Sequence, residues 1–210
     1  MTSQSRALTT TPTHTAAPEG AAHAQGGISN VILGMLLFIT SEVMFFAGLF
    51  AAYFSTRAAN KPWPPTQFAH TLNPLSLILV ATIILIASSF TCQFAVWAIR
   101  RGDRRGFIRN ISVTFVLGII FLVLQAYDYT QLFDEGLKLG SGPFGTTYFT
   151  LTGFHGAHVF AGVVWLSFVL TRALRGGVTQ QNHMAVELVG LYWHFVDLVW
   201  IIIFTIVYLL

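Results

Sequence analysis

The sequence predicts an all-α integral membrane protein, a bundle of five transmembrane helices. Of its 210 residues, 54% are hydrophobic and 9% are charged, whereas soluble domains carry about 25% charged residues. A membrane-spanning helix needs about 20 apolar residues. Five segments meet this requirement, at about 29–55, 74–99, 109–133, 146–171 and 188–210. Together they leave no room for a soluble catalytic domain after residue 28.

The segment before the first span, residues 1–28, is rich in Thr, Ala, Pro, Gly and His. This composition predicts a disordered cytoplasmic tail. The run Ala22-His23-Ala24 has the small residues of a signal-peptidase site, but no apolar segment precedes it, so we predict no signal peptide. His14 and His23 lack a regular ligand spacing and are expected to be solvated rather than metal-bound.

Loop charges predict the orientation of the bundle. Arginines gather between the second and third spans, and they are Arg100, Arg101, Arg104, Arg105 and Arg109. The opposite side carries fewer cations, partly balanced by Asp134 and Glu135. Because cytoplasmic loops carry an excess of Lys and Arg, both the N-terminus and this loop are predicted to be cytoplasmic, and the C-terminus outside. The net charge of +3 is explained by loop arginines, so no nucleic-acid surface is predicted.

The first span contains an acidic residue, Glu42, near its middle. A charged acidic side chain there costs roughly 2.5–3.5 kcal/mol on insertion scales. We therefore expect Glu42 to be protonated or hydrogen-bonded to a partner helix. A structural bond between helices and a proton-handling role both remain open.

Small residues recur every four positions in two spans. Gly48 and Ala52 lie in the first span, and Gly153, Ala157 and Ala161 lie in the fourth. Such stripes allow close contact between helices in lipid. They predict a packed bundle without specifying which one.

The second and third spans offer fewer functional candidates. A stiff external loop, Lys61–Pro65, precedes the second span, whose start is marked by Asn73 as the N-cap and Pro74 as the first helical residue. Cys92 is the single cysteine, so it forms no internal disulfide and is predicted to be a packing residue. Asp128, at the end of the third span, is predicted to be a solvated or interfacial carboxylate.

Histidines mark the fourth and fifth spans. His155 and His158 lie three residues apart and share a helix face, and His194 follows in the fifth span. If the three imidazoles approach one another, they raise a metal or haem hypothesis. A packing or hydrogen-bonding role is favoured, because no cysteine pair or HExxH motif accompanies them. His158 and His194 are expected to bond carboxylates or backbone carbonyls.

The fifth span opens with the motif Tyr192–Trp200, in which His194 and Asp197 lie on one face. This pair would be costly in lipid, so it is predicted to face protein, water or a headgroup. Glu187 stands just before the span, near the cytoplasmic interface. It is expected to be solvated, to pair with an arginine or to meet a headgroup.

Four stretches of the chain resemble subunit III of the haem–copper respiratory oxidases. They are Phe38–Gly48, Gln125–Tyr129, Gly145–Val159 and Tyr192–Trp200, and they follow one another in the family's order. The long form of this family has seven helices, with two before the glutamate-bearing helix. Here that helix is the first predicted, so the chain resembles the short bacterial form, and another subunit would have to complete the family's lipid-filled cleft.

The resemblance implies an accessory subunit with no catalytic residue, metal or redox cofactor of its own. The haem and copper would lie in the partner catalytic subunits, and this chain would pack against oxidase subunits I and II, bind phospholipid, support proton uptake and limit inactivation during turnover. By motif, Glu42 corresponds to the family's buried carboxylate. The implied lipid-binding or structural polar cluster is His155, His158, Glu187, His194 and Asp197.

The resemblance extends to the electron donor. The pairs Ser41-Glu42 and Ala47-Gly48 and the Trp63-Pro64-Pro65 loop are similar to the cytochrome c type found in actinobacterial oxidases. This implies the bacterial plasma membrane and a possible cytochrome bc complex as a supercomplex partner. The alternatives are subunit III of a quinol oxidase, a homologue attached to a nitric oxide reductase, a stand-alone membrane haem protein and a proton-coupled transporter.

Overall fold

Five long α-helices build the protein in the computed structural model, which describes residues 29–66 and 77–210. They are α1 (Asn30–Ala59), α2 (Leu77–Arg100), α3 (Arg104–Asp134), α4 (Pro143–Leu174) and α5 (Met184–Phe204), and α5 continues into a π-helical turn, η2 (Thr205–Leu209). All five are long and apolar enough to cross a membrane. No strand occurs within the described ranges. The predicted all-α membrane fold is confirmed.

Several helices extend beyond the predicted spans, because capping rather than hydropathy sets their ends. The third helix begins at Arg104 instead of residue 109, since the Asp103 side chain caps it by accepting a hydrogen bond from the Gly106 amide at 2.9 Å. The fourth begins at Pro143 instead of residue 146, with proline in the first turn, where it is tolerated. The predicted cap at Asn73 and Pro74 lies outside the described residues.

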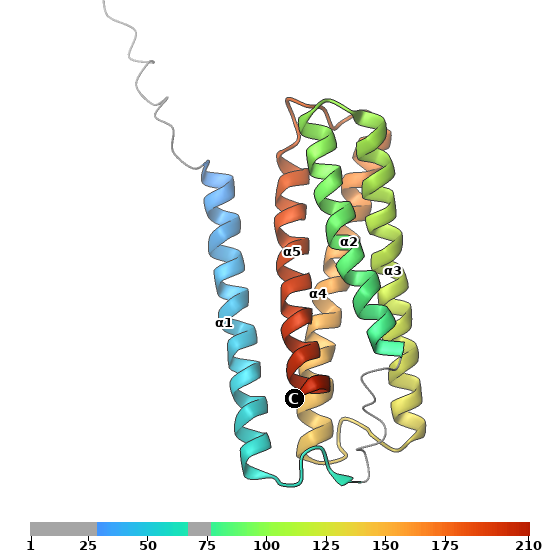
Figure 1. Cartoon of the computed structure of the whole chain (residues 1–210). Helices are drawn as coiled ribbons and strands as arrows, with labels where there is room; N and C mark the ends of the chain where they lie inside the picture. The colour runs from blue at the N-terminus through green and yellow to red at the C-terminus, as the bar shows by residue number, and fades with distance from the viewer. Residues whose placement is uncertain (1–28, 67–76) are drawn as a thin grey trace, which may run out of the picture.

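Helices α2 to α5 form one group, and α1 stands at its edge (Figure 1). A three-residue turn, 101–103, joins α2 to α3, so these helices pack as an antiparallel pair. A bond of 2.8 Å between the hydroxyls of Thr91 and Thr114 links the two. The first helix contacts α4 and α5 and buries only a few residues, which are Met35, Phe46 and Tyr53.

The centre of the helix group is a buried tryptophan, Trp193 on α5. Its ring lies against Gly118 of α3 and Gly162 of α4, where an added Cβ would approach ring carbons to 2.7 Å and 2.8 Å. The indole Nε1 donates to Ser88 Oγ of α2 at 2.9 Å. Four helices therefore meet around one side chain.

The predicted close contact along the small-residue stripes is not found. Gly48 has no atom within 4 Å of a Cβ built on it, and Ala52, Ala157 and Ala161 are exposed. The contacts between α1 and α4 include aromatic rings instead, with Phe45 against Phe154 and Phe46 against His158. The close approach occurs instead at the glycines beside Trp193.

The two ends of the bundle differ in charge. The start of α1, the 101–103 turn and the segment between α4 and α5 lie at one end, together with the predicted arginine cluster (Figure 1). The chain ends at the opposite side, where the Arg57 guanidinium donates to the Leu210 carbonyl at 2.7 Å. We call the first the arginine-rich end. The tail at 1–28 lies outside the described residues.

Candidate functional site

The polar residues singled out from the sequence do not form one cluster. The structure places Glu42 with His158, isolates His155 in the core, sets His194 and Asp197 in a cavity between α2 and α5, and leaves Glu187 at the arginine-rich end. The prediction that these residues form a single polar cluster is therefore wrong. Each group has its own surroundings and chemistry.

Glu42 and His158 join α1 to α4 within the apolar part of both helices. His158 Nε2 lies 2.9 Å from Glu42 Oε2. The Glu42 side chain is 20% exposed, and the His158 side chain is 18% exposed. The rings of Phe45 and Phe46 flank the imidazole. The expectations of a bond between helices for Glu42 and of a carboxylate partner for His158 are both met.

The second ring nitrogen of His158 limits where protons can reside. His158 Nδ1 lies 2.7 Å from the Phe154 carbonyl oxygen, which can only accept, so Nδ1 carries a proton. The contact between Nε2 and Glu42 then holds one proton, either on the imidazole or on the carboxyl group. The two arrangements are a charged pair and a neutral pair of the same geometry.

His155 is fully buried and has no hydrogen-bond partner on either ring nitrogen among the described residues. Its ring stacks on Trp200 of α5, with centroids 4.8 Å apart, and meets the edge of Phe121 of α3. Although His155 and His158 are one turn apart, they contact different helices. His155 acts in packing.

The imidazole of His194 is held by α2 rather than by a carboxylate or a backbone carbonyl, as had been expected. His194 Nδ1 lies 2.6 Å from Ser89 Oγ, and Nε2 lies 3.1 Å from Gln93 Oε1. Ser89 and Gln93 are one helical turn apart, so they present both groups to the ring. The expected partner was wrong because polar side chains of the second span supply both bonds.

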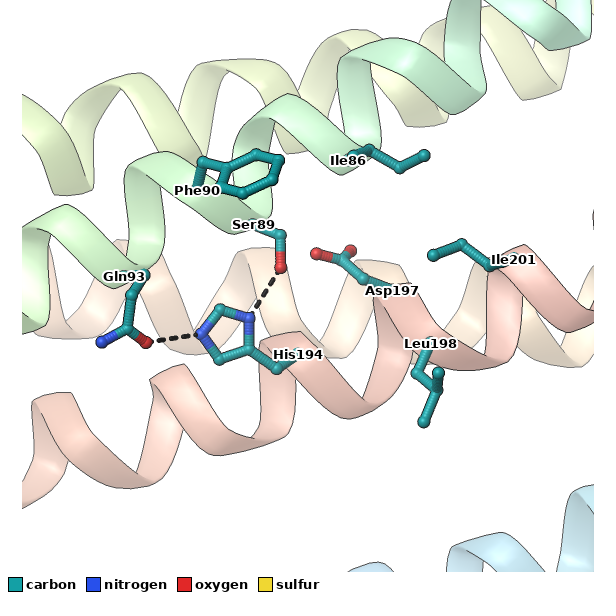
Figure 2. A pocket seen from close by; sticks show the side chains of 8 residues that line it. All are labelled: Ile86, Ser89, Phe90, Gln93, His194, Asp197, Leu198 and Ile201. Carbon is teal, nitrogen blue, oxygen red and sulfur yellow. Dashed lines mark hydrogen bonds between the residues drawn. The ribbon is translucent and has the colours of Figure 1, made fainter.

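Asp197 shares a cavity of about 370 Å³ with His194. Figure 2 shows its carboxylate directed from α5 toward the Ser89 hydroxyl, which is bonded to the imidazole. The residue is 4% exposed, both carboxylate oxygens are buried, and the Ser89 side chain is the polar group that interacts with them. As predicted, the pair faces protein rather than open lipid, but the two members do not bond each other.

Glu187 lies in the first turn of α5 rather than before the helix. Its Oε1 lies 2.9 Å from Arg100 Nε and 3.1 Å from His183 Nε2. The acidic position suits the positive end of the helix dipole. The expected pairing with an arginine is confirmed, and it ties α2 to α5 at the arginine-rich end.

The three histidines do not converge, because each contacts a different set of neighbours. Within residues 29–66 and 77–210, no group of three or more His, Cys, Asp and Glu side chains is placed to hold a metal ion. The geometry therefore gives no support to the metal or haem hypothesis raised by their spacing.

Hydroxyl and amide groups at the end opposite the arginines were missed by the sequence reasoning. Gln125 Nε2 donates to the Thr152 carbonyl at 3.0 Å, and the hydroxyls of Tyr129 and Thr152 are 2.7 Å apart. The Tyr148 hydroxyl bonds that of Tyr208. The sequence reasoning did not single them out as site residues, although Gln125, Tyr129, Tyr148 and Thr152 lie within stretches that carry the family resemblance.

Comparison with known proteins shows which protein family this chain matches. The model of the family described as cytochrome c oxidase subunit III matches residues 14–210. A protein of Mycobacterium bovis named "Probable cytochrome c oxidase subunit 3" is 43% identical over 189 residues, which cover 89% of this chain and 91% of that protein.

Two further relatives carry similar names. The "Cytochrome c oxidase subunit 3" of Corynebacterium diphtheriae is 46% identical over 181 residues, 85% of this chain and 87% of its own length. That of Sus scrofa is 40% identical over 180 residues, which cover 83% of this chain and 67% of the longer relative.

Proposed function

This chain belongs to the cytochrome c oxidase subunit III family, and on that premise we propose that it supports proton uptake by the catalytic part of a proton-pumping oxidase. It is a multi-pass protein of the bacterial plasma membrane and a subunit of a haem–copper oxidase. In this proposal it performs no redox step itself.

The contact between Glu42 and His158 carries the proposal. It places one exchangeable proton between two helices, at a site that is largely shielded but not closed. Its two proton positions need no rearrangement of heavy atoms. A proton-uptake accessory requires a group of this kind, able to take up and release a proton without unfolding its surroundings.

Partners follow from the family. We propose that the chain packs against oxidase subunits I and II, that these hold the haem and copper, and that cytochrome c is the electron donor, in keeping with the names of the relatives. A cytochrome bc complex is the proposed supercomplex partner.

The orientation and the lipid partner belong to the same proposal. The arginine-rich end would face the cytoplasm, since cytoplasmic loops are enriched in Lys and Arg. Bound phospholipid would lie there, where Trp165, Arg172 and Asn182 line a small hollow between α4 and α5. An arginine beside a tryptophan at the interface suits a phosphate and its acyl chains.

The test uses the intact oxidase purified with this subunit. The Glu42→Gln side chain keeps the shape of the glutamate and can still hydrogen-bond to His158. Its amide cannot take up or release the proton that the carboxyl group shares with the imidazole. We expect normal haem content, together with slower proton uptake or a shorter active lifetime under turnover. Glu135→Gln, an exposed carboxylate near the end of α3, is the matched control.

Two results would count against the proposal. If Glu42→Gln matches the wild type in turnover, pumping and lifetime, the contact is structural only. If the tagged chain is recovered from mild detergent without a large haem-containing subunit, the assignment of partners fails as well.

A further inference from the structure

The pair formed by Glu42 and His158 depends on the spacing of α1 and α4, and α5 contributes a side chain that touches both of these helices. That side chain is Tyr192, which is 4% exposed. Its hydroxyl bonds α4, and its ring stacks on a residue of α1. The two contacts lie close in sequence to the two members of the pair.

The hydroxyl of Tyr192 is bonded to α4 at the residue that carries the imidazole. It donates to the backbone carbonyl oxygen of His158 at 3.0 Å. A carbonyl oxygen has two lone pairs, so it accepts this bond in addition to the helical bond from the amide four residues later. The Tyr192 hydroxyl therefore fixes the α4 backbone at His158, while the bond between Nδ1 and the Phe154 carbonyl fixes the ring itself.

A glycine on α4 lets the phenol ring come this close to the helix. A Cβ built on Gly162 would lie 3.2 Å from Tyr192 Cε1, which is tighter than most Cβ contacts. Gly162 lies one helical turn beyond His158, so the space that it leaves open is beside the carbonyl that accepts the bond. The glycine that admits the indole of Trp193 thus admits the phenol ring of Tyr192 as well.

The ring of Tyr192 reaches α1 one turn before Glu42. It stacks on Phe38, with ring centroids 6.3 Å apart and planes inclined by 29°. Phe38 and Glu42 are four residues apart, so they share a helix face. Since α1 buries only a few residues, a contact one turn from Glu42 bears directly on where its carboxyl group lies.

The distance between the carboxyl and the imidazole decides whether the two groups share a proton. The observed distance of 2.9 Å between Nε2 and Oε2 is that of a normal hydrogen bond. A displacement of α1 by about half an ångström away from α4 would take the two atoms beyond the usual range of about 2.7–3.2 Å. The contact therefore requires that both helices be held in place beside it.

We propose that Tyr192 is a positioning residue for the proton-sharing contact. Its hydroxyl holds the backbone of His158, its ring holds α1 beside Glu42, and together they keep the carboxyl and the imidazole at bonding distance. This inference rests on the proposed function of the contact. Tyr192 acts in it through the two helices and holds no transferred proton itself.

The experiment compares infrared spectra of the intact purified oxidase with the wild-type chain and with Tyr192→Phe, at one pH. The absorption of Glu42 is identified as the part that Glu42→Gln removes. Tyr192→Phe keeps the ring and deletes only the hydroxyl. We expect the Glu42 carboxyl to absorb at higher frequency, or to gain protonated carboxyl absorption at the expense of carboxylate. Both changes follow when the bond to the imidazole weakens, because a largely buried carboxyl without its partner is more stable neutral.

Tyr53→Phe is the matched control, because it removes a buried hydroxyl from α1 itself, about three turns beyond Glu42. It should leave the Glu42 absorption unchanged. Phe38→Leu removes the stacking partner on α1 and should move the absorption in the same direction as Tyr192→Phe. Phe38 is 45% exposed, so this change leaves the core intact, and it decides the matter if Tyr192→Phe fails to assemble.

A wild-type Glu42 absorption in Tyr192→Phe overturns the proposal, and so does an equal change in Tyr53→Phe. If Tyr192→Phe does not assemble, a wild-type absorption in Phe38→Leu overturns it. The spectrum reports the contact itself, so this result is independent of turnover. If Tyr192→Phe alters the absorption while Glu42→Gln turns over and pumps normally, the positioning role stands and the proton-uptake function fails. If both hold, Tyr192→Phe slows proton uptake, and by less than Glu42→Gln does.

Discussion

The indole of Trp193 on α5 packs directly on the backbone of Gly162 on α4. A Cβ added at Gly162 would lie 2.8 Å from Trp193 Cζ3, closer than side chains normally approach. The ring is fully buried and cannot swing outward, because its Nε1 is bonded to Ser88. The distance between α4 and α5 is thus set by the absence of a side chain at one position.

We expect Gly162→Ala to destabilise the bundle by about 1–3 kcal/mol, since the added methyl must push the indole or the helices apart. The measurement is unfolding in increasing dodecyl sulfate. Gly48→Ala is the control, because nothing lies within 4 Å of its Cβ position and alanine favours the helix. Equal stability of the two variants would show that Trp193 does not set the spacing.

The bond between Glu42 and His158 should contribute about 0.6 kcal/mol, and no more than about 1.7, as is typical of polar pairs between membrane helices. A double-mutant cycle with Glu42→Gln and His158→Phe isolates this coupling. The readout is again unfolding in dodecyl sulfate. Strict additivity of the two changes would mean that the 2.9 Å contact adds nothing to stability.

His194→Ala should loosen α2 from α5, because the imidazole joins Ser89 and Gln93 to α5. We expect reduced retention of the chain when the oxidase is purified in detergent. Ser89→Ala breaks one of the same bonds, so it should give a smaller loss that does not add fully to that of His194→Ala. Complete retention of the His194→Ala chain would refute this.

Glu187→Gln should change stability by less than about 1 kcal/mol, because Arg100 is half exposed and water screens the pair. The difference between variant and wild type should shrink further as salt is raised. Thermal denaturation at low and high ionic strength tests both points. A large loss that salt does not affect would indicate a buried role for Glu187.

Hydropathy predicted the helices well because every segment that crosses the bilayer must be apolar and must satisfy its backbone hydrogen bonds internally. The ends were less accurate. α3 begins at Arg104 because the Asp103 side chain caps it through a single hydrogen bond. Hydropathy did not indicate this cap, because Asp103 lies outside the apolar segment.

The candidate site was only half predictable. Glu42 and His158 stood out as polar residues in apolar spans, but nothing local indicated that they would meet across 116 positions of sequence. Ser89 and Gln93 were overlooked because serine and glutamine are unremarkable in a span. Their four-residue spacing, which puts both on one helix face, was the available signal.

The three-residue turn between α2 and α3 has a consequence for biogenesis. Because the connection is so short, α2 and α3 must stay close together once both cross the membrane. The two helices are therefore suited to enter the bilayer as a hairpin during synthesis. The hydroxyls of Thr91 and Thr114, each of which also bonds a carbonyl of its own helix, can then bond each other as soon as the hairpin forms. α1, the least buried of the five helices, packs on α4 and α5 and so is not needed for this hairpin to form.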